Sequence, residues 1–399
     1  MVASIGHPSL GSRRQNGIAT LLALFVVAYL FWLSFSIRSL GTVSTGIVDS
    51  LDKASRGGGL QSTALTVLDE NTPRPEVKAF DESRTKYPDG TLRFDRRRRA
   101  AYSEISEGAD TITSAPETLF LVLTKDSKSW SKENEKSAPR TVHDMLNLIH
   151  STGLDIGDTS IAIMTAARSE YDAIISATTQ YEFARITVML SRPDKELQAI
   201  SGQDRHAGGV QRVRRGALAR LRNYLMLSSL EREKHILWVD ADVVHFSEGV
   251  VQTMIRQSET NTTAGIMTVL CRKPSNGNYD ANAFRVNNPD WVQHEIAEEK
   301  FEEANSAYLA ARKGVQYLIQ QTGDDDLVEL SSVGGTLLYM RASLVRLGLI
   351  FPWFNIIGTT WAGEGWMGLE TEGICWAARF MDGGGCYTLG GSHVVTHAE

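Results

Sequence analysis

Two aspartates stand one residue apart, in Asp240-Ala241-Asp242, at the end of the apolar run 235–239. A buried strand that ends in this way can present both carboxylates to one divalent cation, and such a cation can bind a diphosphate. A helix-like stretch, 248–257, follows the pair, which therefore lies at the sheet edge where open α/β folds bind ligands. The motif is short and also arises by chance, so its context carries the interpretation. We predict a nucleotide-sugar transferase.

The composition is that of a globular protein with additional terminal segments. The chain has 399 residues, of which 42% are hydrophobic, enough for one large α/β domain or two modest ones. Its 41 basic and 47 acidic residues leave a formal net charge of −6, which argues against a nucleic-acid-binding protein held mainly by phosphate contacts. An anionic ligand therefore needs a local group of basic residues.

Residues 18–37 form a nearly unbroken apolar run without an ionisable side chain. At about 1.5 Å per residue a helix of this length spans roughly 30 Å, the thickness of a hydrocarbon core, so we predict a membrane anchor. Arg13 and Arg14 precede the run and only Arg38 directly follows it, which favours a cytoplasmic amino terminus and a lumenal body, a type II topology. A cleaved signal peptide is the alternative, but its apolar region is usually only about 7 to 15 residues long.

The predicted organisation is a cytoplasmic tail over 1–17, the anchor over 18–37, a largely disordered stem over 38–116 and a folded domain over 117–399. The stem is rich in Ser, Thr, Gly and charge and has no sustained apolar periodicity, so we assign it no fold. An arginine run at 96–99, reinforced by Arg93, is interpreted as a solvated part of this stem. A processing site or a contact with an acidic partner is the alternative.

One N-glycosylation sequon starts at Asn261, and it is usable only if the body lies in the secretory lumen. The three cysteines, Cys271, Cys375 and Cys386, allow at most one intrachain disulfide. Cys375 and Cys386 are nearest in sequence. Three buried thiols are the alternative, and the sequence leaves the choice open.

From residue 117 onward, short apolar segments alternate with helical ones. Segments 118–124, 160–165 and 185–190 are predicted as buried strands, and 141–152 and 168–181 as helices. This alternation predicts an α/β domain with a mostly parallel central sheet covered by helices on both faces. No Gly-x-Gly-x-x-Gly or Walker sequence follows the first strand, so phosphate binding must rely on a metal and on basic side chains.

Those basic side chains lie in 211–223, a predicted helix whose apolar residues recur at four-residue spacing. Arg215 and Arg222, two turns apart, share one face of this helix. A solvated basic face is the usual interpretation of an arginine-rich helix. Because this helix directly precedes the Asp-x-Asp strand, we predict instead that Arg214, Arg215 and Arg222 stabilise the charge of a diphosphate.

Six sequence blocks follow one another in a fixed order. They are Arg-Arg-x-x-Leu-Ala-Arg-x-Arg-Asn (214–223), Trp-x-Asp-Ala-Asp-Val (238–243), Tyr-Asp-x-Asn (279–282), Leu-x-x-Val-Gly-Gly-Thr (330–336), Gly-x-Ile-Phe-Pro (348–352) and Glu-Thr-Glu-Gly (370–373). Together, and over about 117–399, they resemble the fungal mannan polymerase family of Golgi α-mannosyltransferases. No single block would be specific enough.

The resemblance implies a GT-A glycosyltransferase domain that uses GDP-mannose and Mn²⁺. It implies transfer with retention of configuration, extending an α-1,6-linked mannan backbone on N-glycans. It also implies a single-pass Golgi membrane protein with a lumenal catalytic domain and with other mannosyltransferase subunits as partners. A non-catalytic assembly subunit of a mannan polymerase complex is the alternative. A different metal enzyme, such as a phosphohydrolase, is less favoured because no further clustered His and Asp ligands mark a second metal.

In that family the Asp-x-Asp pair contacts the metal and the diphosphate, which here implies Asp240 and Asp242. A histidine close to the carboxyl terminus completes the family's metal site, and His397 occupies the matching position. The family usually has a Leu-Pro-Asn-Tyr-like stretch before this histidine, whereas 389–393 reads Leu-Gly-Gly-Ser-His. His393 is therefore a rival ligand, and we prefer His397.

The resemblance also assigns Asp280 and Arg214 to the catalytic site, and Arg215, Arg222 and Asn223, with Asp240, to the nucleotide-sugar. Asp280 lies in a stretch whose Gly, Asn and Asp residues also suit a simple turn. Both interpretations stay open at this point.

Glu370 and Glu372 precede a helical stretch, 374–380. We predict that they act on the acceptor side, taking a proton from the acceptor hydroxyl or binding sugar hydroxyls. The alternative is that they only favour the helix amino terminus.

Trp353, Trp361 and Trp366 are interspersed with glycines, a composition that suits a loop offering flat faces to sugar rings. A core role for at least one of these tryptophans is equally open.

Overall fold

The computed structural model describes residues 79–99, 116–134, 136–192, 208–273, 275, 277–287, 296–359 and 363–398. Within these ranges no helix is both long and apolar enough to cross a membrane. The predicted tail, the predicted anchor over 18–37 and most of the predicted stem lie outside the described residues. They stay predictions.

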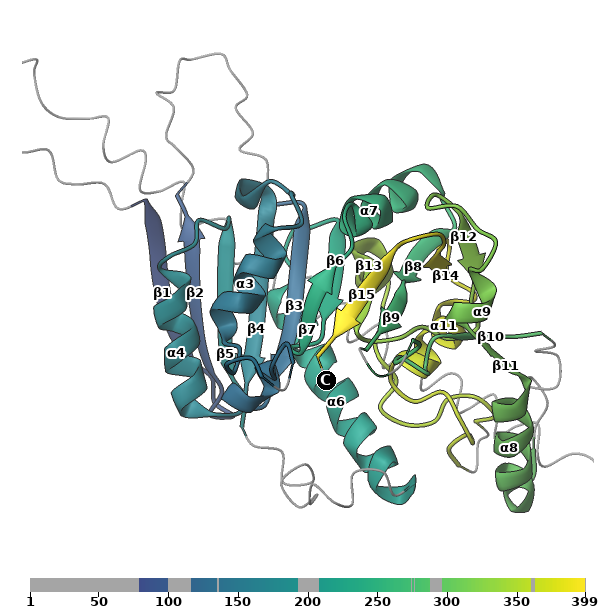
Figure 1. Cartoon of the computed structure of the whole chain (residues 1–399). Coiled ribbons are helices and arrows are strands. Elements are labelled where there is room, and N and C mark those ends of the chain that lie inside the picture. The colour runs from purple at the N-terminus through teal and green to yellow at the C-terminus, as the bar shows by residue number, and fades with distance from the viewer. Residues whose placement is uncertain are drawn as a thin grey trace, which may run out of the picture. The chain divides into compact units, whose positions relative to one another are not determined.

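The described chain is built around a ten-stranded sheet with the order β1-β2-β5-β4-β3-β6-β13-β8-β14-β12 (Figure 1). Strands β5, β4, β3 and β6 run parallel, as do β8 and β14. The other neighbouring pairs are antiparallel. The strands of this sheet are β1 Phe80–Lys86, β2 Leu92–Arg98, β3 Thr118–Thr124, β4 Thr159–Thr165, β5 Arg185–Leu190, β6 His235–Val239, β8 Ala264–Thr268, β12 Leu327–Glu329, β13 Leu337–Arg341 and β14 Gly385–Leu389. Within the described chain the sheet is thus mixed, with four parallel and five antiparallel neighbouring pairs, and the prediction of a mostly parallel sheet holds only for the four central strands.

Helices cover both faces of this sheet, as predicted, because the central strands are apolar on both sides. In β3, Phe120 and Val122 join one buried cluster with residues of α3, α4 and α7, whereas Leu119 and Leu121 join another with residues of α6, α10 and α11. Each such side chain, when fully buried, stabilises the fold by about 1.5–3 kcal/mol. The helices are α3 Val142–His150, α4 Arg168–Thr178, α6 Gly208–Ser229, α7 Val250–Thr260, α8 Phe301–Ala311, α9 Val315–Leu318, α10 Ala342–Arg346 and α11 Thr371–Ala378, with 3₁₀ turns η1 Ser127–Trp130, η2 Ile156–Asp158 and η5 Glu298–Lys300.

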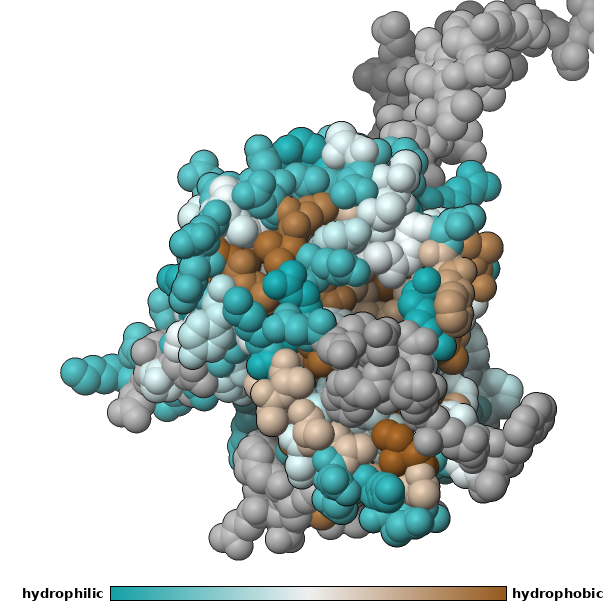
Figure 2. All heavy atoms as spheres, turned by 90° about the vertical axis from the view of Figure 1, so that its right-hand side faces the viewer, coloured by the Kyte–Doolittle hydropathy of each residue, from teal (hydrophilic) through white to brown (hydrophobic). Residues whose placement is uncertain are grey.

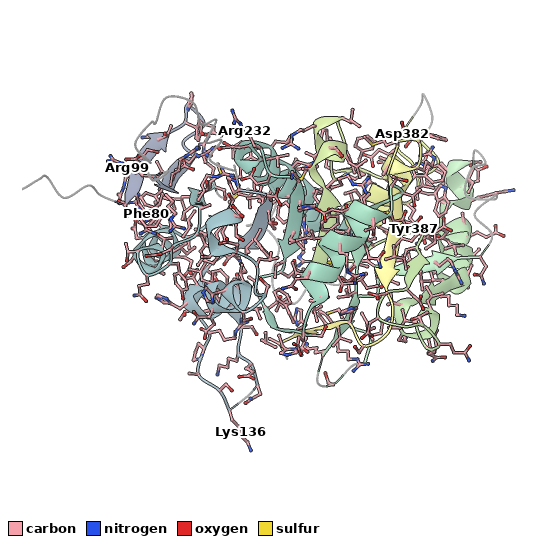
Figure 3. All side chains as sticks on the ribbon, turned by 90° about the horizontal axis from the view of Figure 1, so that it is seen from above. Phe80, Arg99, Lys136, Arg232, Asp382 and Tyr387 are labelled. Carbon is pink, nitrogen blue, oxygen red and sulfur yellow. A yellow bond between two sulfur atoms is a disulfide. The ribbon has the colours of Figure 1, made fainter. Side chains whose placement is uncertain are left out.

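Strands β1 and β2 lie in the region to which the sequence assigns no fold, so that prediction is wrong for 80–98. The Arg96 side chain is buried; it donates to Thr178 O at 2.9 Å, and its guanidinium lies 3.6 Å from the centre of the Phe80 ring. Arg93 pairs with Asp95 at 2.6 Å. Figure 3 shows Phe80 and Arg99 together at this end of the sheet. These two arginines are therefore structural and not part of a solvated stem.

Two smaller sheets complete the fold: β7 Val243–Phe246, β15 Val394–His397 and β9 Leu270–Arg272 form one, and β10 Phe284–Val286 with β11 Arg312–Gly314 the other. In the first, β15 pairs with β7 and brings the carboxyl-terminal strand back to the end of β6. Seen from the side of β12, the surface is mostly hydrophilic, with local hydrophobic patches (Figure 2).

A disulfide joins Cys375 of α11 to Cys386 of β14, with a Cα–Cα distance of 5.8 Å. This is the pair nearest in sequence. Cys271 is free and buried, and burial raises the pKa of its thiol to about 12. The cross-link ties the helix that follows Glu370 to the strand that leads towards β15.

Candidate active site

The Asp-x-Asp pair lies in the tight turn between β6 and β7. The Asp240 amide donates to Thr336 O, just before β13, and the Val243 amide donates to Asp240 O, both at 3.1 Å. Between the two carboxylates, Ala241 is buried in the core. Because this turn follows the last of the parallel strands, both aspartates lie at the carboxyl end of the parallel part of the sheet, as the sequence predicts.

His397 lies directly against the second aspartate. Its Nε2 is 2.9 Å from Asp242 Oδ2, and the Ala398 amide donates to Asp242 O at 2.9 Å. The other ring nitrogen, Nδ1, is 2.6 Å from Ala398 O. A carbonyl can only accept, so Nδ1 carries a proton and Nε2 faces the carboxylate. His393 is also buried, but neither of its ring nitrogens has a hydrogen-bond partner among the described residues.

The turn carries more negative than positive charge. Burial raises the pKa of Asp240, and the charges of Asp242, Asp280 and Glu370 raise it further, while Arg222 acts against them. Burial lowers the pKa of His397, but its hydrogen bond to Asp242 and the charge of that carboxylate outweigh burial and leave it raised. A cation bound at this turn would offset the repulsion among the carboxylates.

The donor types at the turn suit a divalent cation, since they are two carboxylates and one imidazole nitrogen. Within the described part of the chain, however, no group of three or more His, Cys, Asp or Glu side chains is arranged as a metal site. Asp242 and His397 contact each other, whereas Oδ1 of Asp240 is 3.1 Å from Nη2 of Arg222. The residues thus fit a cation by chemistry, with Asp240 engaged by an arginine in this structure.

Asp280 fixes the loop that supports this turn. Its Oδ2 accepts hydrogen bonds from Gly335 N at 2.8 Å, Thr336 N at 3.2 Å and Thr336 Oγ1 at 3.1 Å. A Cβ atom added at Gly334 would lie 2.1 Å from the same oxygen. Since Thr336 O in turn accepts from the Asp240 amide, Asp280 positions the Asp-x-Asp turn through this loop.

The neighbour of Asp280, Tyr279, is part of the Tyr-Asp-x-Asn block, but the sequence assigns it no role in the site. Its ring centre lies 4.1 Å from that of His397. The same side chain is 39% exposed. Tyr279 therefore covers one side of the imidazole and faces solvent with the rest of its ring.

Ion pairs of alternating sign lead from Asp240 into the protein. Nη2 of Arg222 is 3.1 Å from Asp240, and its Nε is 3.1 Å from Glu370. Arg215 lies 3.6 Å from Glu370 and 3.0 Å from Glu372. Arg312 contacts the other oxygen of Glu372. We call these six residues the ion-pair ladder: Asp240, Arg222, Glu370, Arg215, Glu372 and Arg312.

The ladder contains both carboxylates that were predicted for the acceptor side, Glu370 and Glu372. It also contains two of the three predicted arginines, Arg215 and Arg222. Nη2 of Arg215 also donates to Leu369 O at 2.7 Å. Burial lowers the pKa of Arg215, but the charges of Glu372 and Glu370 raise it overall. Each carboxylate oxygen of Glu372 contacts one arginine: Oε2 contacts Arg215, and Oε1 contacts Arg312. Arg222 is the ladder's arginine closest to the Asp-x-Asp turn, since it contacts Asp240 itself.

Arg312 is a site residue that the sequence analysis missed. It lies in the polar segment Arg-Lys-Gly of β11, where no spacing marks it. Only the fold brings it to Glu372, and it also stacks 3.9 Å from the centre of the Phe284 ring. A cation–π contact of this kind is a signal that the fold shows and the sequence does not.

Asn223 holds a backbone segment instead of pointing to the turn. Its Nδ2 donates to Phe351 O and its Oδ1 accepts from Phe351 N, both at 2.8 Å. The carbonyl oxygen of the next residue, Pro352, accepts a hydrogen bond from the Glu370 amide at 2.8 Å. Asn223 thus positions the segment that carries the ladder. Arg214 is half-buried on the same helix, with Nη1 3.5 Å from Gln211 Oε1.

Glu370 has an unusual backbone for a residue with a side chain, with φ 60° and ψ −131°. Such a conformation persists only where surrounding contacts hold it, and it is commonest at functional sites. Here the contacts are Pro352 O on the amide and two arginines on the carboxylate.

The three predicted tryptophans have different environments. Trp366 is buried in a small cluster with Phe284 and Tyr308, which is the core role. Trp353 is 46% exposed. Trp361 lies outside the described residues.

A protein-family model described as Anp1 matches residues 103–355, more than half of the chain. A subunit of the mannan polymerase complex of Schizosaccharomyces pombe, mnn9, is 24% identical over 310 residues, which cover 74% of this chain and 85% of that protein. MNN9 of Candida albicans is 27% identical, over 49% of this chain and 53% of the relative. The VAN1 subunit of mannan polymerase I of Saccharomyces cerevisiae is 28% identical, over 40% of this chain and 32% of the relative.

Among solved structures, a mannosyltransferase of Pyrobaculum calidifontis in complex with GDP-Man and Mn²⁺ aligns with a TM-score of 0.39 and 11% identity. It covers 72% of this chain and 58% of that one. This likeness is too slight to support an argument about fold or ligand. The family model and the curated relatives do not depend on it, and they name the same family that the sequence resembles. The chain therefore belongs to the Anp1 family, that of the fungal mannan polymerase subunits.

Proposed function

We propose that this chain is a metal-dependent retaining mannosyltransferase that uses GDP-mannose to extend an α-1,6-linked mannan backbone on N-glycans. The observation that carries the proposal is the contact of 2.9 Å between Asp242 and His397. It joins the Asp-x-Asp turn to the last strand of the described chain, so two distant segments supply metal-type donors to one place. The names of the relatives support mannan as the product class.

In this proposal Asp240, Asp242 and His397 hold the cation, Mn²⁺. When bound, it supplies positive charge that stabilises the leaving diphosphate. Arg222 places a second, fixed positive charge beside Asp240. Asp280 keeps the turn in position through the loop it anchors.

On the acceptor side, Glu370 is the favoured residue. It is the ladder's carboxylate next to Arg222, and its backbone is strained. Glu372 lies two ion pairs further from Asp240 along the ladder, between Arg215 and Arg312, so we assign it the task of positioning Arg215. A carboxylate that accepts the proton of the acceptor hydroxyl makes that hydroxyl a better nucleophile.

We also propose that the domain has the GT-A fold and lies in the Golgi lumen, held by a type II anchor at 18–37. The central parallel strands, of which β6 ends at the Asp-x-Asp turn, are compatible with that fold. The relatives are named as subunits of complexes, which supports other mannosyltransferase subunits as partners.

The test is an assay of the full-length chain, purified in detergent, with GDP-mannose and α-mannobiose, with Mn²⁺ or with a chelator. The expected result is a mannosylated product whose new linkage is α-1,6 and whose formation stops in the chelator. Asp242→Ala is expected to abolish turnover. The matched control is Asp325→Ala, because Asp325 is an exposed residue that pairs with Arg256.

A non-catalytic assembly subunit is the second candidate. Two observations favour it: the relatives are named as complex subunits, and Asp240 is turned to Arg222 instead of to Asp242 and His397. In that case Asp242→Ala would leave the activity of the assembled complex unchanged, whereas removal of the whole chain would abolish it.

A further inference from the structure

We propose that Asn261 carries an N-linked glycan, placed at the end of the sheet opposite to the Asp-x-Asp turn. The inference rests on the lumenal orientation of the proposed function, and it adds a modification site to it. The sequence Asn261-Thr262-Thr263 is the chain's one Asn-x-Ser/Thr sequon, and its middle residue is not proline.

The sequon lies in an accessible turn between α7 and β8. Asn261 is half-buried, whereas Thr262 and Thr263 are both exposed. Oδ1 of Asn261 accepts hydrogen bonds from Thr263 N at 3.0 Å and from Thr263 Oγ1 at 2.8 Å. No described residue bonds the Nδ2 of this side chain, so the amide nitrogen is the end left for a sugar.

The backbone of the turn is held in place without the asparagine side chain. Nη2 of Arg341 donates to Asn261 O, and Nη1 to Thr262 O, at 3.1 and 3.0 Å. The hydroxyl of Tyr387 lies 2.9 Å from Thr263 Oγ1, and Tyr387 is labelled in Figure 3. A glycan would thus extend from a rigid point instead of replacing a contact of the fold.

The turn is distant from the candidate active site. Arg341, which binds it, pairs with His235 at the start of β6, whereas Asp240 follows the end of that strand. Five strand residues at about 3.3 Å each separate the two by roughly 16 Å. Accordingly, Figure 1 shows α7 near the upper end of the sheet, whereas β15, which ends with His397, points towards the lower end of the sheet.

The chemistry requires a lipid-linked oligosaccharyl diphosphate as co-substrate and a separate oligosaccharyl transferase. Nδ2 of Asn261 forms a bond to the first sugar carbon and loses one proton. The bond from that carbon to the diphosphate oxygen breaks, and the lipid diphosphate leaves. The fold only has to accommodate the product, which an exposed turn does.

The experiment is to express the full-length chain in a fungal cell and to treat it with peptide N-glycosidase. Wild type is expected to gain mobility on treatment. Asn261→Gln and Thr263→Ala are expected to run at the deglycosylated position before treatment. Thr262→Ala keeps an Asn-x-Thr sequon, so it is expected to behave as wild type. Because the glycan lies far from the turn, Asn261→Gln is expected to keep mannosyl transfer within about twofold.

A second variant separates this site from the orientation of the chain. Lys136→Thr creates a sequon at Asn134, in the exposed loop whose tip Lys136 marks in Figure 3. If this variant gains a glycan while wild type has none, the domain is lumenal and the inference about Asn261 is wrong. If neither is modified, the domain does not reach the lumen, and the inference and the proposed location fail together.

Discussion

Nε2 of His397 lies 2.9 Å from Oδ2 of Asp242. The register of β15 on β7 shifts between Thr396 and His397, and this irregularity sets the imidazole opposite the turn. His393, four residues earlier and equally buried, has no described hydrogen-bond partner for its ring. The two histidines that the sequence leaves in competition therefore have different environments.

Replacing His397 by alanine is expected to weaken Mn²⁺-dependent binding of GDP-mannose by about tenfold or more, because one of three donors is lost. His393→Ala is the matched control: it removes a buried imidazole of the same segment and is expected to leave binding within about twofold. Isothermal titration with and without Mn²⁺ measures both, and thermal unfolding checks that each variant is folded. The opposite ranking of the two variants would assign the ligand to His393.

Gly334 is expected to tolerate no side chain. In Gly334→Ala the new Cβ would lie 2.1 Å from Asp280 Oδ2, so the loop or the carboxylate must move. We expect the free energy of unfolding to fall by about 1–3 kcal/mol. Transfer activity should fall with it, because Thr336 O in this loop accepts the hydrogen bond of the Asp240 amide. Denaturant unfolding and the mannosyl-transfer assay measure the two effects.

Gly277→Ala is the control for this change, because a Cβ there meets no atom within 4 Å. It is expected to be nearly neutral. The double variant Gly334→Ala with Asp280→Ala relieves the clash, so its unfolding free energy should be higher than the sum of the single effects predicts. Strict additivity would contradict the contact.

Arg312 is expected to be needed for stability although it lies far from Asp240 along the ladder. Arg312→Met leaves Glu372 with one arginine instead of two in a buried position, which should destabilise the fold by about 3 kcal/mol. Combining it with Glu372→Gln should restore part of that loss, and a double-mutant cycle measured by chemical unfolding gives the coupling.

The exposed pair Arg97 and Glu231 is the comparison. Its coupling is expected at about 0–1 kcal/mol, and equal couplings for both pairs would exclude a special role for the ladder.

The centre of the fold is predictable from the sequence because β3, β4 and β5 are short, apolar on both faces and separated by helical segments, a pattern typical of buried parallel strands. Strand β2 was missed because its sequence, Leu-Arg-Phe-Asp-Arg-Arg-Arg, resembles a solvated segment. Arg96, one of its arginines, is buried through partners that come from elsewhere in the chain, such as Thr178 O. The local sequence pattern cannot identify those partners, because they are distant in the sequence.

In the candidate site too, features set by neighbouring residues are predictable from the sequence, whereas contacts between distant segments are not. The Asp-x-Asp turn is encoded within a few residues, and the position of Asp240 and Asp242 follows from the strand before them. Arg312 comes to the ladder from a separate two-stranded sheet, 60 residues before Glu372 in the sequence. The family resemblance identified Asn223 as a site residue but not its structural role. That role is a hydrogen bond to the backbone of Phe351, 128 residues away.

Asn223 supports the Phe351 backbone in this structure, and that role predicts a loss of stability without a loss of donor affinity. Asn223→Ala leaves a buried N–H and a buried C=O of Phe351 unpaired, at about 1–3 kcal/mol each. Asn223→Asp keeps the acceptor for the Phe351 amide and loses the donor, so its stability should be intermediate. Measured well below the unfolding midpoint, the KM for GDP-mannose should change less than about threefold in both variants. A direct contact with the nucleotide-sugar would instead raise KM in Asn223→Asp more than its unfolding free energy falls, because the carboxylate would repel the diphosphate.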